Sequence, residues 1–119
     1  MEIIYGNEVK EISNPGVLSR KLLNLDNSAS ERVSITEVHV VPGASQPRHT
    51  HNFSEQIWYA LQGKGKVLLH DNQEMDFKAG DIIRFAEKDV HGLFNDGPTE
   101  FVYISVTSPP VKREIINNP

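Results

Sequence analysis

The sequence predicts a single all-β domain, built as a β-sandwich or a β-barrel. Apolar residues recur with a period close to two along most of the chain, which is the spacing of a strand with one buried face. These segments are short and regularly spaced, with Gly, Pro, Asn or Asp between them. At 119 residues the chain has the size of one domain, so we expect residues 1–119 to form a single unit.

Turn residues divide the first half of the chain into predicted strands. The strands are Glu2–Tyr5, Leu18–Leu23, Val33–Val41 and Arg48–His51. Asn14-Pro15-Gly16 predicts a turn before the second strand, and Pro42-Gly43 ends the third. The polar run from Asn24 to Glu31 has too few apolar residues for a core element and is predicted to be a loop.

The second half continues the same pattern. Its predicted strands are Gln56–Gln62, Lys66–His70, Glu74–Phe77, Asp81–Phe85, Val90–Asn95 and Glu100–Thr107. Predicted turns lie at Gly63-Lys64-Gly65, at Asp71-Asn72, at Gly80, where Asp81 is expected to close the turn, and at Asn95-Asp96-Gly97-Pro98. The only helix candidate is a short, weak one around Lys112–Ile116, after Pro109-Pro110.

Charge and composition exclude several classes of function. The net charge is -4 and the charged residues are interspersed, which argues against nucleic acid or an anionic membrane as the main partner. No apolar run is long enough to span a bilayer, and Met1 opens without a signal-peptide pattern, so a cytoplasmic protein is expected. The chain has no cysteine, so any metal must be held by nitrogen and oxygen atoms.

Two histidines stand one residue apart in the predicted strand Arg48–His51. Side chains at i and i+2 of a strand share a face, so the imidazoles of His49 and His51 can reach one point. A metal would satisfy both polar rings inside a barrel, and Glu55 and Gln56 follow as possible oxygen donors. His39 and His70 lack this context and are interpreted as ordinary hydrogen-bonded or exposed residues.

At these residues the chain resembles the cupins. Their first motif, G-x5-H-x-H-x3,4-E-x6-G, matches at Gly43, His49, His51 and Gly63, with Gln56 at the glutamate position. Their second motif, G-x5-P-x-G-x2-H-x3-N, matches at Gly80, His91 and Asn95. Ala86 and Lys88 replace the proline and glycine of that motif. The resemblance thus covers two blocks, residues 43–63 and 80–95.

The resemblance implies a small single-domain cupin of the cupin 2 type, a double-stranded β-helix or RmlC-like jelly-roll β-barrel that encloses a metal. It implies His49, His51 and His91 as ligands. Some cupins use glutamine as the fourth ligand through its amide oxygen, so Gln56 is predicted here, with Glu55 as the alternative. The donor set suits Ni, Fe, Mn, Co, Cu or Zn and does not choose among them. Neutral ligands would leave the ion its full charge, which favours an anionic substrate.

The side chains expected around this centre come from three segments. Trp58 shares the strand face of Gln56, and Phe53 precedes that strand at the expected mouth of the pocket. Tyr103 and Ser105 share a face of the last strand, which the resemblance suggests is the inner one; Phe101, on the same face, is interpreted as core. Tyr103 is the candidate acid–base group, with a metal-bound water as the alternative. Surface charge is the preferred interpretation of three arginines that might bind a carboxylate, Arg20, Arg48 and Arg84.

Function is predicted only as a class. The segment Gly16–Lys21, the residue Gln56 and the ending Thr107-Ser108-Pro109 are similar to the small cupins of pectin breakdown, which linearise unsaturated uronates. Those relatives carry an acidic residue where this chain has Ser105. The expected activity is therefore that of a metal-dependent lyase or isomerase acting on a small oxygenated acid. The alternatives are an iron-dependent dioxygenase and a non-catalytic ligand-binding cupin. The resemblance implies a homodimer, for which Ile3–Tyr5 and Val33–Val41 offer apolar faces.

Overall fold

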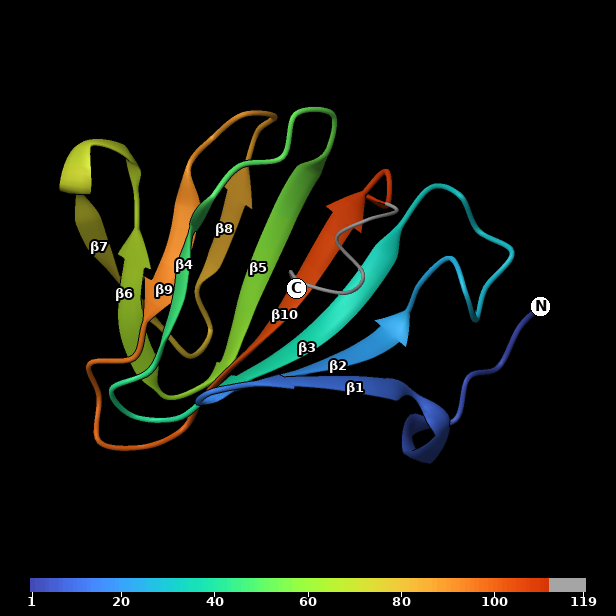
Figure 1. Ribbon diagram of the computed structural model, residues 1–119, viewed down its shortest axis with the longest axis horizontal. Coiled ribbons are helices and arrows are strands. Elements are labelled where there is room, and N and C mark those ends of the chain that lie inside the picture. The colour runs from blue at the N-terminus through green and yellow to red at the C-terminus, as the bar shows by residue number, and fades with distance from the viewer. Residues whose placement is uncertain (112–119) are drawn as a thin grey trace.

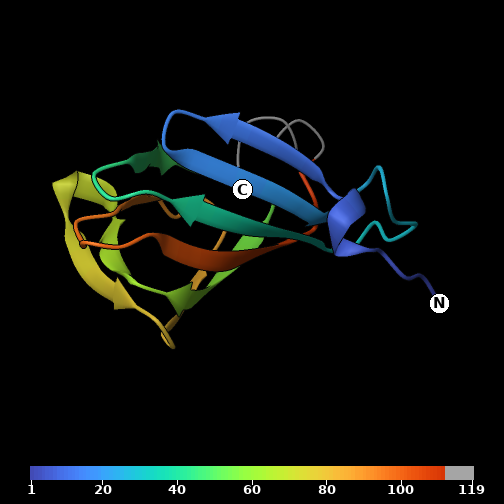
Figure 2. The ribbon, with the colours of Figure 1, turned by 90° about the horizontal axis from the view of Figure 1, so that it is seen from below.

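The computed structural model describes residues 1–111, which form two antiparallel β-sheets that face each other across one core. The larger sheet A has the order β1-β2-β3-β10-β5-β8, and the smaller sheet B has the order β4-β9-β6-β7. Figure 2, seen from below, shows the two sheets enclosing a common interior. This is the predicted all-β barrel. The predicted helix around Lys112–Ile116 lies outside the described residues.

The strands are short and follow the predicted segments closely. Sheet A consists of β1 (Lys10–Asn14), β2 (Val17–Leu23), β3 (Ser34–Val40), β5 (Glu55–Gln62), β8 (Ile82–Phe85) and β10 (Phe101–Ser108). Sheet B consists of β4 (Ser45–His49), β6 (Lys64–Leu68), β7 (Glu74–Lys78) and β9 (His91–Phe94). Two 3₁₀ turns, η1 (Gly6–Glu8) and η2 (His70–Asn72), complete the set. No helix within residues 1–111 has the length and apolar character that crossing a bilayer requires.

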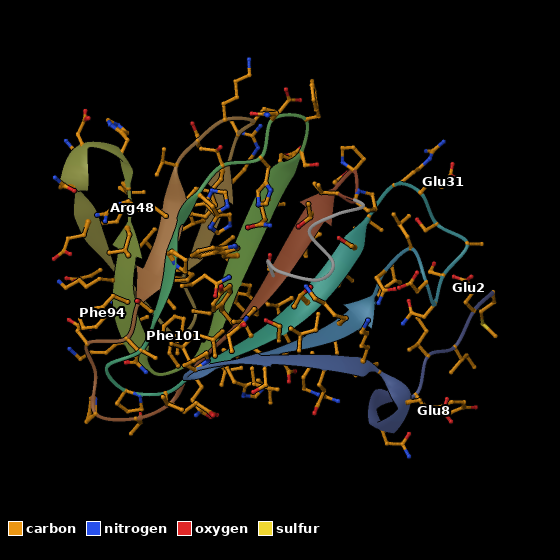
Figure 3. All side chains as sticks on the ribbon, viewed as in Figure 1. Glu2, Glu8, Glu31, Arg48, Phe94 and Phe101 are labelled. Atoms are coloured by element: carbon orange, nitrogen blue, oxygen red, sulfur yellow. The ribbon has the colours of Figure 1, made fainter. Side chains whose placement is uncertain are left out.

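The N-terminal strand is the clearest error of the sequence prediction. Glu2–Tyr5 has no regular structure, and the side chains of Ile3 and Tyr5 are exposed. An apolar run becomes a strand only where another strand supplies hydrogen bonds, and none of the strands within residues 1–111 pairs with it. Instead, the unpredicted β1 pairs with β2 around the predicted turn at Pro15-Gly16. The carboxylate of Glu2 accepts hydrogen bonds from Ser28 and Ala29, which holds this segment against the loop after β2 (Figure 3).

The glycines of both cupin motifs occupy positions that need their backbone freedom. Gly43, Gly63 and Gly80 have φ values of 84°, 82° and 95°, in the left-handed region that side chains disfavour. A Cβ atom at Gly63 would also lie 2.7 Å from the carbonyl oxygen of Glu100. Asp81 follows Gly80, and its carboxylate accepts a hydrogen bond from the backbone N–H of Lys78. This contact closes the turn as predicted. The motif spacing therefore marks the bends that carry the chain from one sheet to the other.

The core fills the space between the sheets with apolar and aromatic side chains. Along β5 and β10, alternate residues are buried, so Trp58, Tyr103 and Phe101 face inward as expected. Trp58 packs against Tyr103 with ring centroids 4.6 Å apart, and Phe101 packs against Phe77 at 5.7 Å (Figure 3 labels Phe101). This aromatic layer closes the barrel beneath the histidines.

Candidate metal centre

Three imidazoles from separate parts of the sequence meet between the sheets. One ring nitrogen from each of His49, His51 and His91 lies within 4.8 Å of the others. The ring centroids are 4.3 Å apart for His49 and His91, 5.1 Å for His49 and His51, and 5.0 Å for His51 and His91. Within the described residues, this is the group of histidine and acidic side chains whose geometry suits a metal ion.

Strand pairing explains how distant residues come together. His49 ends β4 and His91 begins β9, and the two are cross-strand partners at the edge of sheet B. Pro47 lies inside β4, which an edge strand tolerates because one side of its backbone needs no ladder partner. The predicted strand Arg48–His51 is displaced: β4 starts earlier and stops at His49. His51 lies beyond the strand end, yet its ring still reaches the other two.

Backbone carbonyls determine the tautomer of two of these rings, that is, which ring nitrogen carries the proton. Nδ1 of His49 lies 2.8 Å from the carbonyl oxygen of Pro47, and Nδ1 of His91 lies 2.9 Å from that of Asp89. A carbonyl oxygen only accepts, so both rings carry their proton on Nδ1 and leave Nε2 as a lone pair. This is the form in which histidine binds a metal, held by a hydrogen bond on its other nitrogen.

Burial keeps the ring of His91 neutral. This ring is stacked on Phe85 with centroids 4.5 Å apart and meets the edge of Trp58 at 5.6 Å. Burial, followed by the neighbouring His49, lowers the pKa of His91 to about 3. Its Nε2 atom is buried and has no hydrogen-bond partner within residues 1–111. The residues present therefore fit a divalent transition metal held by imidazole nitrogens.

Gln56 is the inward residue at the start of β5, and Glu55 is not. Gln56 is 1% exposed, and its side chain reaches His51, Trp58 and Thr107. Glu55 is half exposed and accepts a hydrogen bond from Arg84 at 2.9 Å, on the opposite face of the strand. The alternation of β5 thus places Gln56 at the centre, as the motif count indicates. Its role as a fourth ligand stays a prediction.

The predicted pocket residues divide into interior and surface positions. Tyr103 and Ser105 lie on the inner face of β10, fully buried, and their hydroxyl oxygens have no hydrogen-bond partner within the described chain. Burial raises the pKa of Tyr103, so its phenol stays protonated at ordinary pH and keeps an O–H that can donate. Phe53 is 80% exposed and lines a surface pocket with Thr50 and Pro109.

The three arginines form ion pairs and hydrogen bonds with other residues of the fold. Arg20 binds the carboxylates of Glu11 and Glu37, and Arg84 binds Glu55. Arg48 donates to the carbonyl oxygens of Leu69 and Gln73, which hold it beside the connection from β6 to β7 (Figure 3). The remaining two histidines also match their interpretation. His39 is bound by two glutamates, and His70 is exposed beside Asp71.

One buried lysine, Lys21, was not predicted from the sequence. Lys21 is only 3% exposed, because it continues the inward series Val17 and Ser19 of β2. Register places it opposite Thr36, which in turn pairs with Ser105. The alternation of β2 could have identified this burial, because it assigns Lys21 to the same face as Val17. A lysine is so seldom buried that composition alone assigns it to the surface.

Comparisons with known proteins agree with this architecture. An uncharacterised protein of Methanocaldococcus jannaschii is 31% identical over 103 residues, which cover 87% of this chain and 82% of that protein. An oxalate-binding protein of Thermotoga maritima is 33% identical over 66 residues, or 55% of this chain and 53% of that protein. The solved structure of KdgF from Halomonas sp. superposes with a TM-score of 0.79 at 20% identity, covering 94% of this chain and 98% of that one. The family model described as a cupin domain matches residues 36–107, and the chain belongs to this cupin family.

Proposed function

We propose that this cupin is a metal-dependent enzyme that acts on a small oxygenated acid, with lyase or isomerase chemistry. The observation that carries the proposal is the convergence of three imidazoles, two of them with Nδ1 hydrogen-bonded to a backbone carbonyl. His49, His51 and His91 would hold one divalent ion. When bound, such an ion supplies a Lewis acid that polarises a carboxylate or carbonyl oxygen.

The chain's own residues favour an anionic substrate. Within residues 1–111, the group of side chains that could hold the ion consists of three imidazoles and contains no carboxylate that would offset the charge of the ion. The buried Lys21 adds an amino group to the inner face of sheet A. Ser105 and Tyr103 offer hydroxyl groups on the same wall, and the protonated phenol of Tyr103 is the candidate proton donor. The aromatic rings of Trp58 and Phe85 contact the ring of His91 and keep water from that side of it.

A second candidate is a binding protein without catalysis. The relative from Thermotoga maritima is named an oxalate-binding protein, and its similarity spans 66 residues, about half of each chain. A small dicarboxylate is also an oxygenated acid, so the same centre would suit it. Metal-loaded protein that binds oxalate or a uronate, yet leaves both unchanged, would favour this candidate. Uptake of oxygen by the iron-loaded protein would instead indicate a dioxygenase.

The first test is metal retention. Replacing His49 and His91 with alanine should reduce bound Ni²⁺ or Zn²⁺ to background after dialysis, measured by elemental analysis, because one imidazole does not hold the ion. His70→Ala is the matched control, since His70 is exposed in η2 and lies outside the histidine cluster, and it should leave occupancy unchanged. Full occupancy in the double variant would contradict the assignment of these histidines.

We also propose that two copies form a homodimer through the outer face of sheet A. The predicted apolar surfaces need correction, because Ile3–Tyr5 is not a strand and the outward residues of β3 include Glu37 and His39. The supporting surface lies on the neighbouring strands β5, β8 and β10. It comprises the apolar side chains of Ile57, Tyr59, Leu61, Ile82, Ile104 and Val106.

A further inference from the structure

The inner face of sheet A carries a row of polar side chains, although the interior of a barrel mostly holds apolar ones. Register places Lys21 of β2 opposite Thr36 of β3, and Thr36 opposite Ser105 of β10. Ser105 in turn lies opposite Trp58 of β5. Lys21, Thr36 and Ser105 are 3%, 5% and 1% exposed, so each is on the inward side of its strand. The row therefore crosses the interior from β2 to Trp58.

Two hydroxyl groups beside this row lack the hydrogen bonds that buried polar groups need. Ser105 and Tyr103 lie on the inner face of β10, two positions apart, and both are fully buried. Neither hydroxyl oxygen has a hydrogen-bond partner within residues 1–111. A buried hydroxyl without a partner destabilises a fold, and native proteins rarely keep one unless a ligand or a water completes it. Two of them on one strand therefore indicate a place where a bound molecule presents acceptor atoms.

Trp58 connects the row to the three imidazoles. Its ring centroid lies 5.6 Å from that of His91 and 4.6 Å from that of Tyr103. Neighbouring strands of a sheet are about 4.8 Å apart. Ser105 on β10 is one strand away from Trp58, and Lys21 on β2 is two strands beyond Ser105. A small acid that binds at the imidazoles with one end can therefore extend along the row with the other.

The groups of the row suit a carboxylate at that other end. The hydroxyl groups of Ser105 and Tyr103 each have an O–H to donate, and the amino group of Lys21 donates as well. A carboxylate accepts several hydrogen bonds, and its negative charge favours the protonated form of a neighbouring lysine. The inward residues of β2, β3 and β10 include no aspartate or glutamate. Nothing on the inner face of these strands repels an anion.

We propose that Ser105 and Lys21, with the hydroxyl of Tyr103 beside them, form a subsite for a second carboxylate, so that the substrate is a dicarboxylate whose acid groups are separated by carbon atoms. The inference rests on the proposed function, since the first carboxylate has to bind an ion held by the imidazoles. The subsite then holds the far end of the substrate and orients its carbon chain. Oxalate does not reach the subsite, because its carboxylates are bonded to each other and both chelate the ion.

Calorimetry of the Zn²⁺-loaded protein with oxalate, succinate and glutarate tests this subsite. Ser105→Ala should weaken binding of succinate or glutarate, whichever the parent binds more tightly, by about tenfold, the scale of one lost hydrogen bond to a charged group. Oxalate binding should stay within about threefold. Ser19→Ala is the matched control and should change neither affinity. Ser19 is also buried on the inner face of sheet A, but its neighbour toward β10 is the apolar Val38.

The second substitution removes the amino group of the row. Lys21→Met keeps a long unbranched side chain and should weaken the same longer dicarboxylate by about tenfold or more, while oxalate is again spared. Lys10→Met is the matched control, because Lys10 on β1 is the cross-strand partner of Lys21 but is exposed. Circular dichroism and retained Zn²⁺ verify that each variant is folded with its centre intact. If Lys21→Met does not fold, Ser105→Ala alone decides.

The remaining outcomes separate the subsite from the metal centre. The subsite is wrong if a folded variant at Ser105 or Lys21 binds the longer acid as tightly as the parent does. It is also wrong if oxalate and the longer acid lose affinity equally, because the altered residue then acts at the ion. A parent that binds oxalate but neither longer acid overturns it as well. An unaltered protein that binds no Zn²⁺, or binds Zn²⁺ but none of the acids, would instead defeat the proposed function.

Discussion

At the scale of single residues, Lys88 shows how this chain departs from the cupin motif without losing its geometry. The motif has glycine at this position, and Lys88 adopts the left-handed backbone that glycine would, with a φ of 70°. Its backbone N–H donates to the carbonyl oxygen of His51 at 2.7 Å. The strained residue thus ties the β8–β9 loop to one of the three clustered histidines. The conformation is required by the site, although the side chain is poorly suited to it.

This strain predicts an order of stability among substitutions at Lys88. The left-handed conformation costs a non-glycine residue about 1–2 kcal/mol, and a β-branched residue more. Lys88→Gly relieves that cost but adds about 0.4–1 kcal/mol of unfolded-state freedom. The glycine variant should therefore be at least as stable as the parent, and Lys88→Val about 1 kcal/mol or more less stable. Urea denaturation measures this, and a valine variant as stable as the parent would contradict it.

At the scale of elements, a charged network joins three strands on the outer face of sheet A. Arg20 of β2 binds Glu37 of β3 at 3.1 Å. His39 of β3 binds Glu37 at 2.7 Å and Glu100, just before β10, at 3.1 Å. Burial opposes the charge on His39, but the hydrogen bonds that its ring donates to both carboxylates outweigh it and raise the pKa of this imidazole. The network therefore strengthens when His39 is protonated.

The raised pKa of His39 predicts how stability depends on pH. The folded state binds this proton more tightly than the unfolded state, whose pKa is near 6.5. Its contribution is complete below that pH and is lost as pH rises through the higher folded pKa. His39→Gln should therefore lower the denaturation midpoint at pH 6 more than at pH 8.5. The exposed His70→Gln is the control. An equal loss at both pH values would show that His39 stabilises the fold only by packing.

A second link between elements explains the asparagine of the cupin motif. Asn95 is fully buried, and its amide nitrogen donates to the carbonyl oxygens of Val40 and Thr99, both at 2.9 Å. Its side-chain oxygen accepts from the N–H of Gly97. One side chain thus closes the β9–β10 connection and ties it to the end of β3. This contact holds the two sheets in the register that brings His49 opposite His91.

At the scale of the whole molecule, the outer face of sheet A predicts the oligomeric state. Tyr59 lies between Ile82 on β8 and Ile104 on β10, at the middle of the apolar surface. A stable interface needs about 800 Å² per partner, and an arginine at its centre would bury an unpaired charge. Tyr59→Arg should therefore convert a dimer to a monomer in light scattering after size exclusion. Met75→Arg, on the exposed edge strand β7, is the control and should leave the dimer intact. A monomeric parent would contradict the proposed dimer.

Local spacing was enough to predict an all-β sandwich or barrel, and to place Trp58 on the strand face of Gln56 and Tyr103 on that of Ser105. These features depend on the two-residue period of a strand and on the turn residues between strands, and both are properties of neighbouring residues. The resemblance to the cupins supplied the rest: it indicated which face of the last strand is the inner one, and the motif count back from Gly63 favoured Gln56 over Glu55, of which Gln56 is the buried residue.

Only the tertiary structure decided which segments pair. Glu2–Tyr5 has the composition of a strand but no partner, whereas β1 is polar and forms because β2 lies beside it. The burial of Lys21 and the hydrogen bond from Trp58 to the amide of Gln56 likewise depend on which side chains meet in the interior. Pairing across long stretches of chain is set by the closure of the whole barrel, and no local period encodes it.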